Sequence, residues 1–347
     1  MKLYKLGSVS WEDSQLLYHA LPRIGREGVI LLSPATPYIC IGYFQDAEQE
    51  VDMAYCRENG IPVFRREVGG GAVYLDGAQL FFQMVIRKDN PLVPQGTKLD
   101  FYRKFLQAPI NAYRALGIPA EYRPVNDIVA NQRKVSGTGA AEIEDYYILV
   151  GNLIVDFNYE MMARLLKVPD EKFRDKVYKT IYDNLSTIKR EVENVPPTDE
   201  LWTLMGDTFM EVLGPMEVQE TVDEEWRAKA DELGETLLTD EWLLRKRPTR
   251  GSGRSVRIRA GVDVHHKMYK APGGLIRATT HVEEGVITHV DISGDFFFFP
   301  REKLNDLAAA LEGVSLAEVE PTLARFYETE GVESPGVTPA DLAQVVG

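Results

Sequence analysis

RREVGGGAVYLDG, residues 65–77, is the stretch that decides how this chain is interpreted. Two arginines follow the apolar run IPVF, and three consecutive glycines then lead into a second run with strand composition. Glycine loses more backbone entropy on folding than alanine does, so three in a row weaken any regular element. The glycines form either a tight strand-to-strand turn or a loop whose N–H groups approach an anion such as a phosphate. Arg65 and Arg66 favour the second interpretation, because arginine forks match phosphate and carboxylate oxygens.

A second informative stretch is NDIVANQRKVSG, residues 126–137, which we expect to be a hairpin with its turn at Asn131-Gln132. Asn126 and Asp127 are either turn openers or ligands of a hydrated Mg²⁺, which needs only one or two oxygen ligands from protein. Lys134 is either a solvated strand lysine or a point charge that reaches a phosphate. The two stretches together make nucleotide-triphosphate chemistry plausible, although no P-loop motif occurs.

Composition restricts the class of protein further. The chain has 347 residues and a net charge of -14, which argues against a general nucleic-acid or anionic-membrane surface. Its two cysteines, Cys40 and Cys56, show no C-x-x-C spacing and are expected to be free thiols in a reducing compartment. We find no signal-peptide pattern and no apolar stretch of roughly 20 residues that could span a bilayer. We therefore expect a cytoplasmic protein with neither nucleic acid nor membrane as a partner.

Apolar periodicity predicts an α+β fold in two domains. The boundary is placed near residue 250, in the basic, glycine-rich segment 245–259, with a large domain over 1–250 and a small one over 251–347. That basic segment is either simply solvated or in contact with an acidic partner surface or with nucleotide phosphates. The run FFFF (296–299) is expected to pack in the core of the small domain. The predicted helices are 12–21, 47–59, 98–116, several within 159–244, 301–312 and 315–330; the predicted strands are 29–33, 38–44, 61–66, 72–75, 79–86, 146–157 as one bulged strand or a pair, and several within 261–299.

The motifs RREVGGGAVYLD, NDI and KVSGTG, in this order, resemble those of the lipoate–protein ligases of the biotin/lipoate ligase superfamily. The segment KAPGGLIRATTHVEEGVITHVDISGDFFFFP is similar to the accessory domain of these ligases, here fused to the C-terminus. The resemblance implies mixed or antiparallel sheets with flanking helices in the catalytic domain, followed by a small α+β accessory domain.

The resemblance also implies a two-step reaction. Lipoate is activated with Mg²⁺ and ATP to lipoyl-AMP, and lipoyl is then transferred to a lysine of a lipoyl carrier. The carrier is a 2-oxoacid dehydrogenase E2, a glycine-cleavage H-type protein or a specialised lipoate-binding protein. By position in the motifs, Lys134 is the catalytic residue and Asp127 the metal ligand. The residues expected to bind ATP and lipoyl-AMP are Arg66, Gly69, Gly70, Gly71, Ala72, Val73, Tyr74, Asn126, Asp127, Lys134, Ser136 and Gly137.

The chain departs from the ligase pattern at several positions. It has Leu75 where the ligases usually carry histidine, Gln79 where asparagine is common, and no histidine near Val150-Gly151. These differences leave the acyl specificity and the carrier open. Two alternatives follow, namely an octanoyl or lipoyl transferase of the same fold and a non-catalytic lipoyl-carrier binding protein. In one transferase branch a catalytic cysteine lies about where Asn126-Asp127 stand here, and neither cysteine of this chain matches it.

Overall fold

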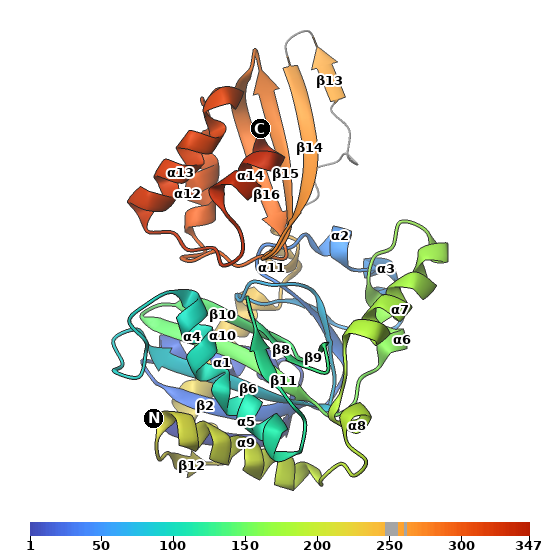
Figure 1. Cartoon of the computed structure of the whole chain (residues 1–347), viewed down its shortest axis with the longest axis vertical. Coiled ribbons are helices and arrows are strands. Elements are labelled where there is room, and N and C mark those ends of the chain that lie inside the picture. Colours follow the sequence, from blue (N-terminus) through green and yellow to red (C-terminus); the bar gives the residue numbers. More distant parts are fainter. Residues whose placement is uncertain (247–255, 260–261) are drawn as a thin grey trace. The chain divides into compact units, whose positions relative to one another are not determined.

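The computed structural model describes residues 1–246, 256–259 and 262–347. They form two compact units, which we call the first unit and the second unit (Figure 1). The first unit consists of Met1–Cys40, Val51–Arg66 and Val73–Leu243. The second unit consists of Leu244–Gly347 together with two segments from the first half of the chain, Ile41–Glu50 and Glu67–Ala72. The predicted boundary at residue 250 falls outside the described residues and stays a prediction. Residues 247–255 of the basic segment also lie outside them, so the predicted contact of this segment with an acidic partner stays a prediction too.

A six-stranded sheet with the order β10-β11-β6-β2-β1-β12 forms the centre of the first unit. β1 pairs in parallel with β2 and β12, whereas the other pairings are antiparallel, so the sheet is mixed, as predicted. The strands are β1 (Lys2–Val9), β2 (Gly28–Pro34), β6 (Gln79–Arg87), β10 (Thr138–Ile143), β11 (Tyr146–Ile154) and β12 (Glu217–Gln219).

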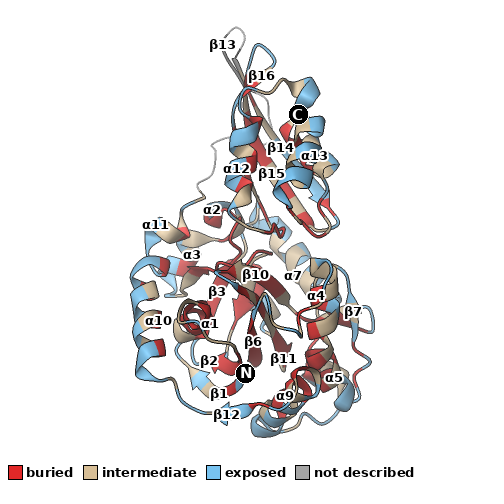
Figure 2. Cartoon of the chain, turned by 90° about the vertical axis from the view of Figure 1, so that its left-hand side faces the viewer, coloured by how far each residue is buried: buried red, intermediate tan, exposed pale blue. Residues whose placement is uncertain are grey.

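Helices cover both faces of this sheet because successive strand residues point to opposite sides. Phe82 on β6 contacts Phe209 of α9 (Thr198–Leu213), with ring centroids 5.5 Å apart. Gln83, the next residue, donates from Nε2 to the Ser14 carbonyl of α1 (Asp13–Arg23) at 2.6 Å. α1 in turn accepts a hydrogen bond from buried Trp226. The buried residues accordingly gather in the sheet and on the inner sides of the helices (Figure 2).

Two three-stranded sheets complete the first unit, with the orders β4-β3-β5 and β7-β8-β9. Their strands are β3 (Tyr38–Ile41), β4 (Val63–Arg65), β5 (Val73–Leu75), β7 (Glu121–Arg123), β8 (Asp127–Ala130) and β9 (Arg133–Ser136). The other helices are α3 (Met53–Glu58), α4 (Lys98–Phe105), α5 (Gln107–Ala115), α6 (Tyr159–Leu165), η1 (Glu171–Phe173), α7 (Arg174–Asn184), α8 (Ile188–Glu191), α10 (Glu224–Leu237) and α11 (Asp240–Leu243).

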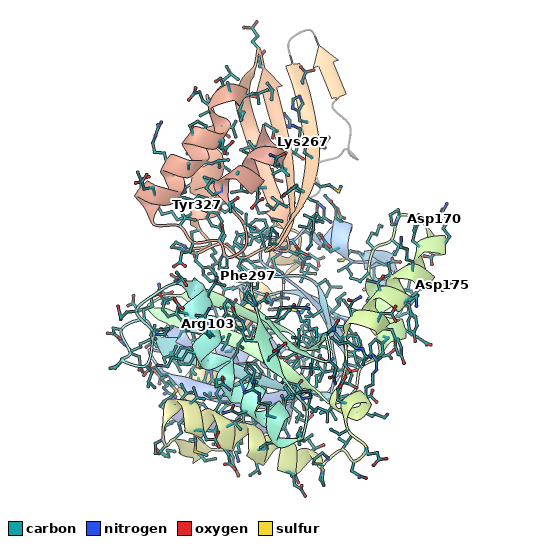
Figure 3. All side chains as sticks on the ribbon, viewed as in Figure 1. Arg103, Asp170, Asp175, Lys267, Phe297 and Tyr327 are labelled. Carbon is teal, nitrogen blue, oxygen red and sulfur yellow. The ribbon has the colours of Figure 1, made fainter. Side chains whose placement is uncertain are left out.

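The second unit is built on an antiparallel sheet with the order β13-β14-β15-β16. Phe296–Phe299 follow the last strand and are buried, as predicted. The Phe298 ring contacts the Tyr327 ring of α13 edge to face. Tyr327 and Phe297, the neighbour of Phe298, are labelled in Figure 3. The elements are α2 (Ala47–Glu50), β13 (Val256–Arg259), β14 (Val262–Ala271), β15 (Gly274–Glu283), β16 (Val286–Gly294), α12 (Lys303–Leu311), η2 (Leu316–Glu318), α13 (Val319–Glu330) and α14 (Pro339–Val346).

Three helical predictions need correction. The helix predicted over 98–116 is divided at Leu106, and the one over 47–59 is two short helices separated by Val51, which bridges to Leu166. The last helix, α14, was not predicted. Its start carries a recognisable signal, because Thr338 and Asp341 form a capping box around Pro339 at the first helical position.

Candidate active site

The predicted hairpin of residues 126–137 is present as β8 and β9. Asn131 and Gln132 both adopt positive φ, 48° and 66°, which a two-residue hairpin turn requires. The turn places Asp127, at the start of β8, and Lys134, on β9, on the same side of the hairpin. The Lys134 carbonyl accepts from the Ser186 amide at 2.8 Å, so the segment after α7 also holds this strand.

Two cations converge on the Asp127 carboxylate. The Lys134 Nζ lies 2.7 Å from Oδ1, and an Arg123 guanidinium nitrogen lies 2.8 Å from Oδ2. Burial by itself raises the pKa of Asp127, but Lys134 and Arg123 together outweigh burial, and the pKa lies below its ordinary value. Asp127 is therefore charged at neutral pH and fixes the position of the Lys134 ammonium. Arg123 was not predicted as a site residue, because it lies in no recognisable motif.

A chain of hydrogen bonds leads from the end of β9 to β5. Asn152 on β11 accepts from the Gly137 amide at 3.0 Å and donates to the Gln79 side chain at 2.8 Å. Gln79 in turn donates to the Tyr74 carbonyl at 3.1 Å, and the Ser136 hydroxyl donates to the Asn152 carbonyl at 2.6 Å. The structure thus joins three predicted site residues through two side chains that were not predicted as site residues. The available signal in the sequence was Asn152 itself, a polar residue inside the apolar run LVGNLIV.

The two adjacent arginines have different roles. Arg66 donates to the Cys40 carbonyl at 3.3 Å and contacts its Sγ at 3.6 Å. Arg65 is fully buried, and its Nε and Nη2 lie 3.0 and 2.7 Å from the Leu243 carbonyl. Trp242 donates from its indole to the Arg65 carbonyl at 2.8 Å. Arg65 therefore satisfies carbonyl groups at the end of α11, and the expectation that it supports an anion site is replaced by a packing role.

The glycines belong to the second unit, where close backbone contacts require glycine at Gly69 and also at Gly42, which packs against Gly70. A Cβ at Gly69 would lie 2.8 Å from the Phe296 carbonyl oxygen, and a Cβ at Gly42 would lie 1.9 Å from the Gly70 carbonyl oxygen. Gly70 has φ 90° and donates its amide to the Phe296 carbonyl at 3.2 Å. At Gly71 the nearest atoms to a Cβ, those of the Asp295 side chain, are 3.7 and 3.8 Å away. Packing against Phe296 therefore explains Gly69, and positive φ explains Gly70, whereas Gly71 has room for a Cβ.

The predicted site residues divide between the two units. Arg66, Val73, Tyr74, Asn126, Asp127, Lys134, Ser136 and Gly137 lie in the first unit, and Gly69, Gly70, Gly71 and Ala72 lie in the second. The Asn126 side chain donates to the Thr138 carbonyl, and the Thr138 hydroxyl donates to the Asn126 carbonyl. Asn126 is thereby fixed beside Asp127, with its side-chain carbonyl as an acceptor.

An open pocket of about 420 Å³ lies beside Tyr74. The Tyr74 ring contacts Phe157 of the pocket wall edge to face, at 6.0 Å between centroids. Burial raises the pKa of the Tyr74 hydroxyl, and Asp76 raises it further. The wall combines aromatic and acidic side chains and consists of Asp76, Ala78, Asp156, Phe157, Asn158, Tyr159, Glu160 and Tyr178.

Two further expectations concern a metal site and a membrane-spanning helix. Within them, no group of three or more His, Cys, Asp or Glu side chains is arranged to hold a metal ion. Mg²⁺ in nucleotide sites is usually held by one or two carboxylates together with substrate phosphates, and a single carboxylate such as that of Asp127 fits that mode. None of the helices in the described part of the chain is long and apolar enough to cross a membrane.

The family model "Lipoyl protein ligase A/B catalytic domain" matches residues 8–210, which is more than half of the chain. The chain belongs to this family. A second model, "Bacterial lipoate protein ligase C-terminus", matches residues 264–345. The suspected resemblance is thereby confirmed, and it extends over both units.

Curated relatives of the family include ligases and transferases. "Lipoate-protein ligase A subunit 1" of Thermoplasma acidophilum is 34% identical over 222 residues, which are 60% of this chain and 82% of the relative. "Octanoyltransferase LipM" of Kyrpidia tusciae is 26% identical over 234 residues, 60% of this chain and 84% of the relative. Membership of the family therefore does not distinguish a ligase from a transferase, and the residues of the site must do so.

Solved structures of lipoate ligases have the same α+β fold. One belongs to a bi-partite lipoate protein ligase studied with its E2 lipoyl domain from Thermoplasma acidophilum, with a TM-score of 0.61, 28% identity, and coverage of 71% of this chain and 98% of that one. Another is lipoate-protein ligase A bound with ATP, with a TM-score of 0.58, 27% identity, and coverage of 70% and 98%. The predicted fold class is confirmed.

Proposed function

We propose that this chain is an ATP-dependent lipoate–protein ligase that forms lipoyl-AMP and transfers lipoyl to a lysine of a lipoyl carrier. The observation that carries the proposal is the Lys134–Asp127 ion pair at 2.7 Å, which holds a lysine in place on the hairpin of residues 126–137. The related ligase whose structure contains ATP supports the choice of nucleotide. The relative studied with an E2 lipoyl domain supports a carrier of that type.

The first step requires positive charge, because a carboxylate and a triphosphate repel each other. The lipoate carboxylate attacks the α-phosphorus of ATP, the bond from that phosphorus to the bridging oxygen breaks, and pyrophosphate leaves. Lys134 supplies a cation at the α-phosphate and at the acyl carbonyl, and Arg66 supplies a second one. Mg²⁺ neutralises phosphate charge when bound, and Asp127 with Asn126 would hold it.

The second step needs no enzyme nucleophile. The carrier lysine, as a free amine, attacks the acyl carbon of lipoyl-AMP, the bond from that carbon to the phosphate oxygen breaks, and AMP leaves while the new amide nitrogen loses a proton. Lys134 stabilises the negative charge that develops on the acyl oxygen.

The structure also bears on the transferase alternative, which requires a reactive thiol. Cys40 and Cys56 are both buried, and burial raises the pKa of each thiol, that of Cys56 to about 11. A buried thiol with a raised pKa is a poor nucleophile, since the thiolate is the reactive form. This observation favours the ligase over a cysteine-dependent transferase.

The test is lipoate-dependent release of pyrophosphate from ATP by the purified protein, without a carrier. We expect lipoate to stimulate release and Lys134→Ala to abolish it while the protein stays folded. Lys179→Ala is the matched control, because Lys179 is an exposed lysine paired only with Asp183 among the ion pairs found in the described residues. A wild-type protein that releases no pyrophosphate with lipoate or octanoate, yet binds a lipoyl domain, would instead indicate the non-catalytic alternative.

A further inference from the structure

Arg301 of the second unit is bound to Glu67 at two points. One guanidinium nitrogen lies 2.6 Å from the Glu67 carboxylate, and the other donates to the Glu67 main-chain carbonyl at 3.1 Å. The two side chains are only 14% and 4% exposed. A single guanidinium therefore fixes both the side chain and the peptide plane of Glu67, which follows Arg66 directly and begins the glycine-rich turn.

The same turn is held at two further points. The Tyr43 amide donates to the Val68 carbonyl at 3.0 Å, and the Gly70 amide donates to the Phe296 carbonyl at 3.2 Å. The Arg301 guanidinium also lies over the Tyr43 ring, 4.9 Å from its centroid. Residues 67, 68 and 70 are thus each bonded to another part of the second unit, and Arg301 contacts both Glu67 and Tyr43, whose amide holds Val68.

Stability alone is a weak explanation for this pair. The cost of removing two charges from water can exceed what their attraction returns, so a buried ion pair is weak evidence for added stability. The charge of Glu67 is not needed for the turn itself, which depends on glycine. What the pair specifies is the orientation of the peptide between Glu67 and the glycines.

We propose that Arg301 is a positioning residue for nucleotide binding: through Glu67 it fixes the main chain of the glycine-rich turn. The inference rests on the proposed function, because it takes Arg66 and the turn as parts of the nucleotide site.

The chain provides a matched control in the second unit. Arg277 forms an ion pair with Glu50, and these side chains are 20% and 18% exposed. This pair ties α2 to β15 and is not bonded to the glycine-rich turn. Arg301→Gln removes the partly buried pair with Glu67 and a more exposed contact with Glu302, whereas Arg277→Gln removes the partly buried pair with Glu50; only the first releases Glu67.

The experiment measures the Mg-ATP dissociation constant by calorimetry, the KM for ATP and kcat in the pyrophosphate assay, and the thermal midpoint of each variant. We expect Arg301→Gln to raise the Mg-ATP dissociation constant and the KM for ATP at least tenfold, and Arg301→Lys to restore part of the affinity. Arg277→Gln should lower the thermal midpoint by a similar amount but leave the dissociation constant and KM within twofold of the wild type. Lysine recovers only part because it lacks the planar fork that reaches both Glu67 oxygens.

Equal effects of Arg301→Gln and Arg277→Gln, in proportion to their loss of thermal midpoint, would overturn the inference. So would an unchanged KM for ATP in Arg301→Gln. Failure of the proposed function looks different: the wild type then binds Mg-ATP without lipoate-dependent pyrophosphate release, and the dissociation constants of the two variants still decide the role of Arg301.

Discussion

The Lys134 side chain reaches diagonally across the β8–β9 hairpin to Asp127, with 2.7 Å between the ammonium nitrogen and a carboxylate oxygen, whereas the direct register partner of Lys134 on β8 is Val129. The hairpin turn at Asn131-Gln132 and the register shift between Ile128 and Val129 together align the two strands, and this distance depends on that alignment. A lysine predicted to contact phosphate is therefore paired in advance, and substrate phosphates must compete with a carboxylate for it. The pair connects the stability of the hairpin to the chemistry of the site.

Asp127→Asn should reduce stability at neutral pH and make stability less dependent on acid. The pKa of Asp127 is lowered in the folded protein, so the pair contributes stability above the ordinary value of about 3.9 and loses it as pH falls through the lower folded value. We expect a loss of about 1.5–3 kcal/mol at neutral pH, as for a hydrogen bond to a charged group. Thermal midpoints measured from neutral to acid pH should converge for the two proteins at the acid end; parallel curves would contradict the assignment.

Substitutions of the three glycines should separate packing from ligand binding. Gly70→Ala must place an alanine at φ 90° and is expected to cost roughly 1–2 kcal/mol. Gly69→Ala should also destabilise, since its Cβ would meet the Phe296 carbonyl. Gly71→Ala should stay within about 0.5 kcal/mol of the wild type, because its surroundings are at ordinary contact distance.

Kinetics then test whether Gly71 serves the nucleotide. If the backbone there must approach a phosphate, Gly71→Ala raises the KM for ATP although the thermal midpoint is unchanged. An unchanged KM would show that the glycines serve packing alone.

Asn152→Ala should lower the free energy of unfolding by more than the loss of one hydrogen bond, because the Asn152 side chain makes two. It leaves the Gly137 amide without its acceptor and the Gln79 carbonyl without its donor, at about 1–3 kcal/mol for each group left unsatisfied. Ser136→Ala, which removes one neutral hydrogen bond to the same residue, should cost only about 1 kcal/mol. Chemical denaturation checks both values, and similar losses for the two variants would indicate that the network does not act as a unit.

Cys40→Ala and Cys56→Ala should leave pyrophosphate release and lipoyl transfer intact. Both thiols are buried, and their raised pKa values keep them protonated at neutral pH. The native protein should accordingly resist alkylation by iodoacetamide until it is unfolded, as mass spectrometry can show. Loss of transfer in either variant, with folding preserved, would revive the transferase alternative.

Local patterns were sufficient for much of the fold. The hairpin of residues 126–137 was predictable from two short apolar runs around Asn-Gln, and the start of α9 from the Pro-Pro-Thr-Asp-Glu sequence. The division of 98–116 at Leu106 was not, because its apolar spacing continues through the break and only tertiary packing decides it. Lys134 and Asp127 were found through a motif, whereas Arg123 and Asn152 come from other strands and meet the site only after folding.

The roles of neighbouring residues were the least predictable part. Arg65 and Arg66 look equivalent in sequence, yet one satisfies the carbonyl of Leu243 and the other lies on Cys40. Alternation along an extended strand sends adjacent side chains to opposite sides, and which side meets which partner depends on residues far away in the chain. The glycines show the same effect, since Phe296 is more than two hundred positions from the turn that it contacts.

Two short segments from the first half of the chain, Ile41–Glu50 and Glu67–Ala72, belong to the second unit, and this has a consequence for any attempt to express the two parts of the chain separately. A polypeptide cut in the basic segment after residue 246 would keep Phe44 and the glycine-rich turn on its longer piece, while the Phe296 ring that stacks on Phe44 at 5.1 Å would leave with the shorter piece. Each fragment would then expose a surface shaped by the other. Co-expression of the halves should restore a soluble pair, whereas either half alone should be prone to aggregate.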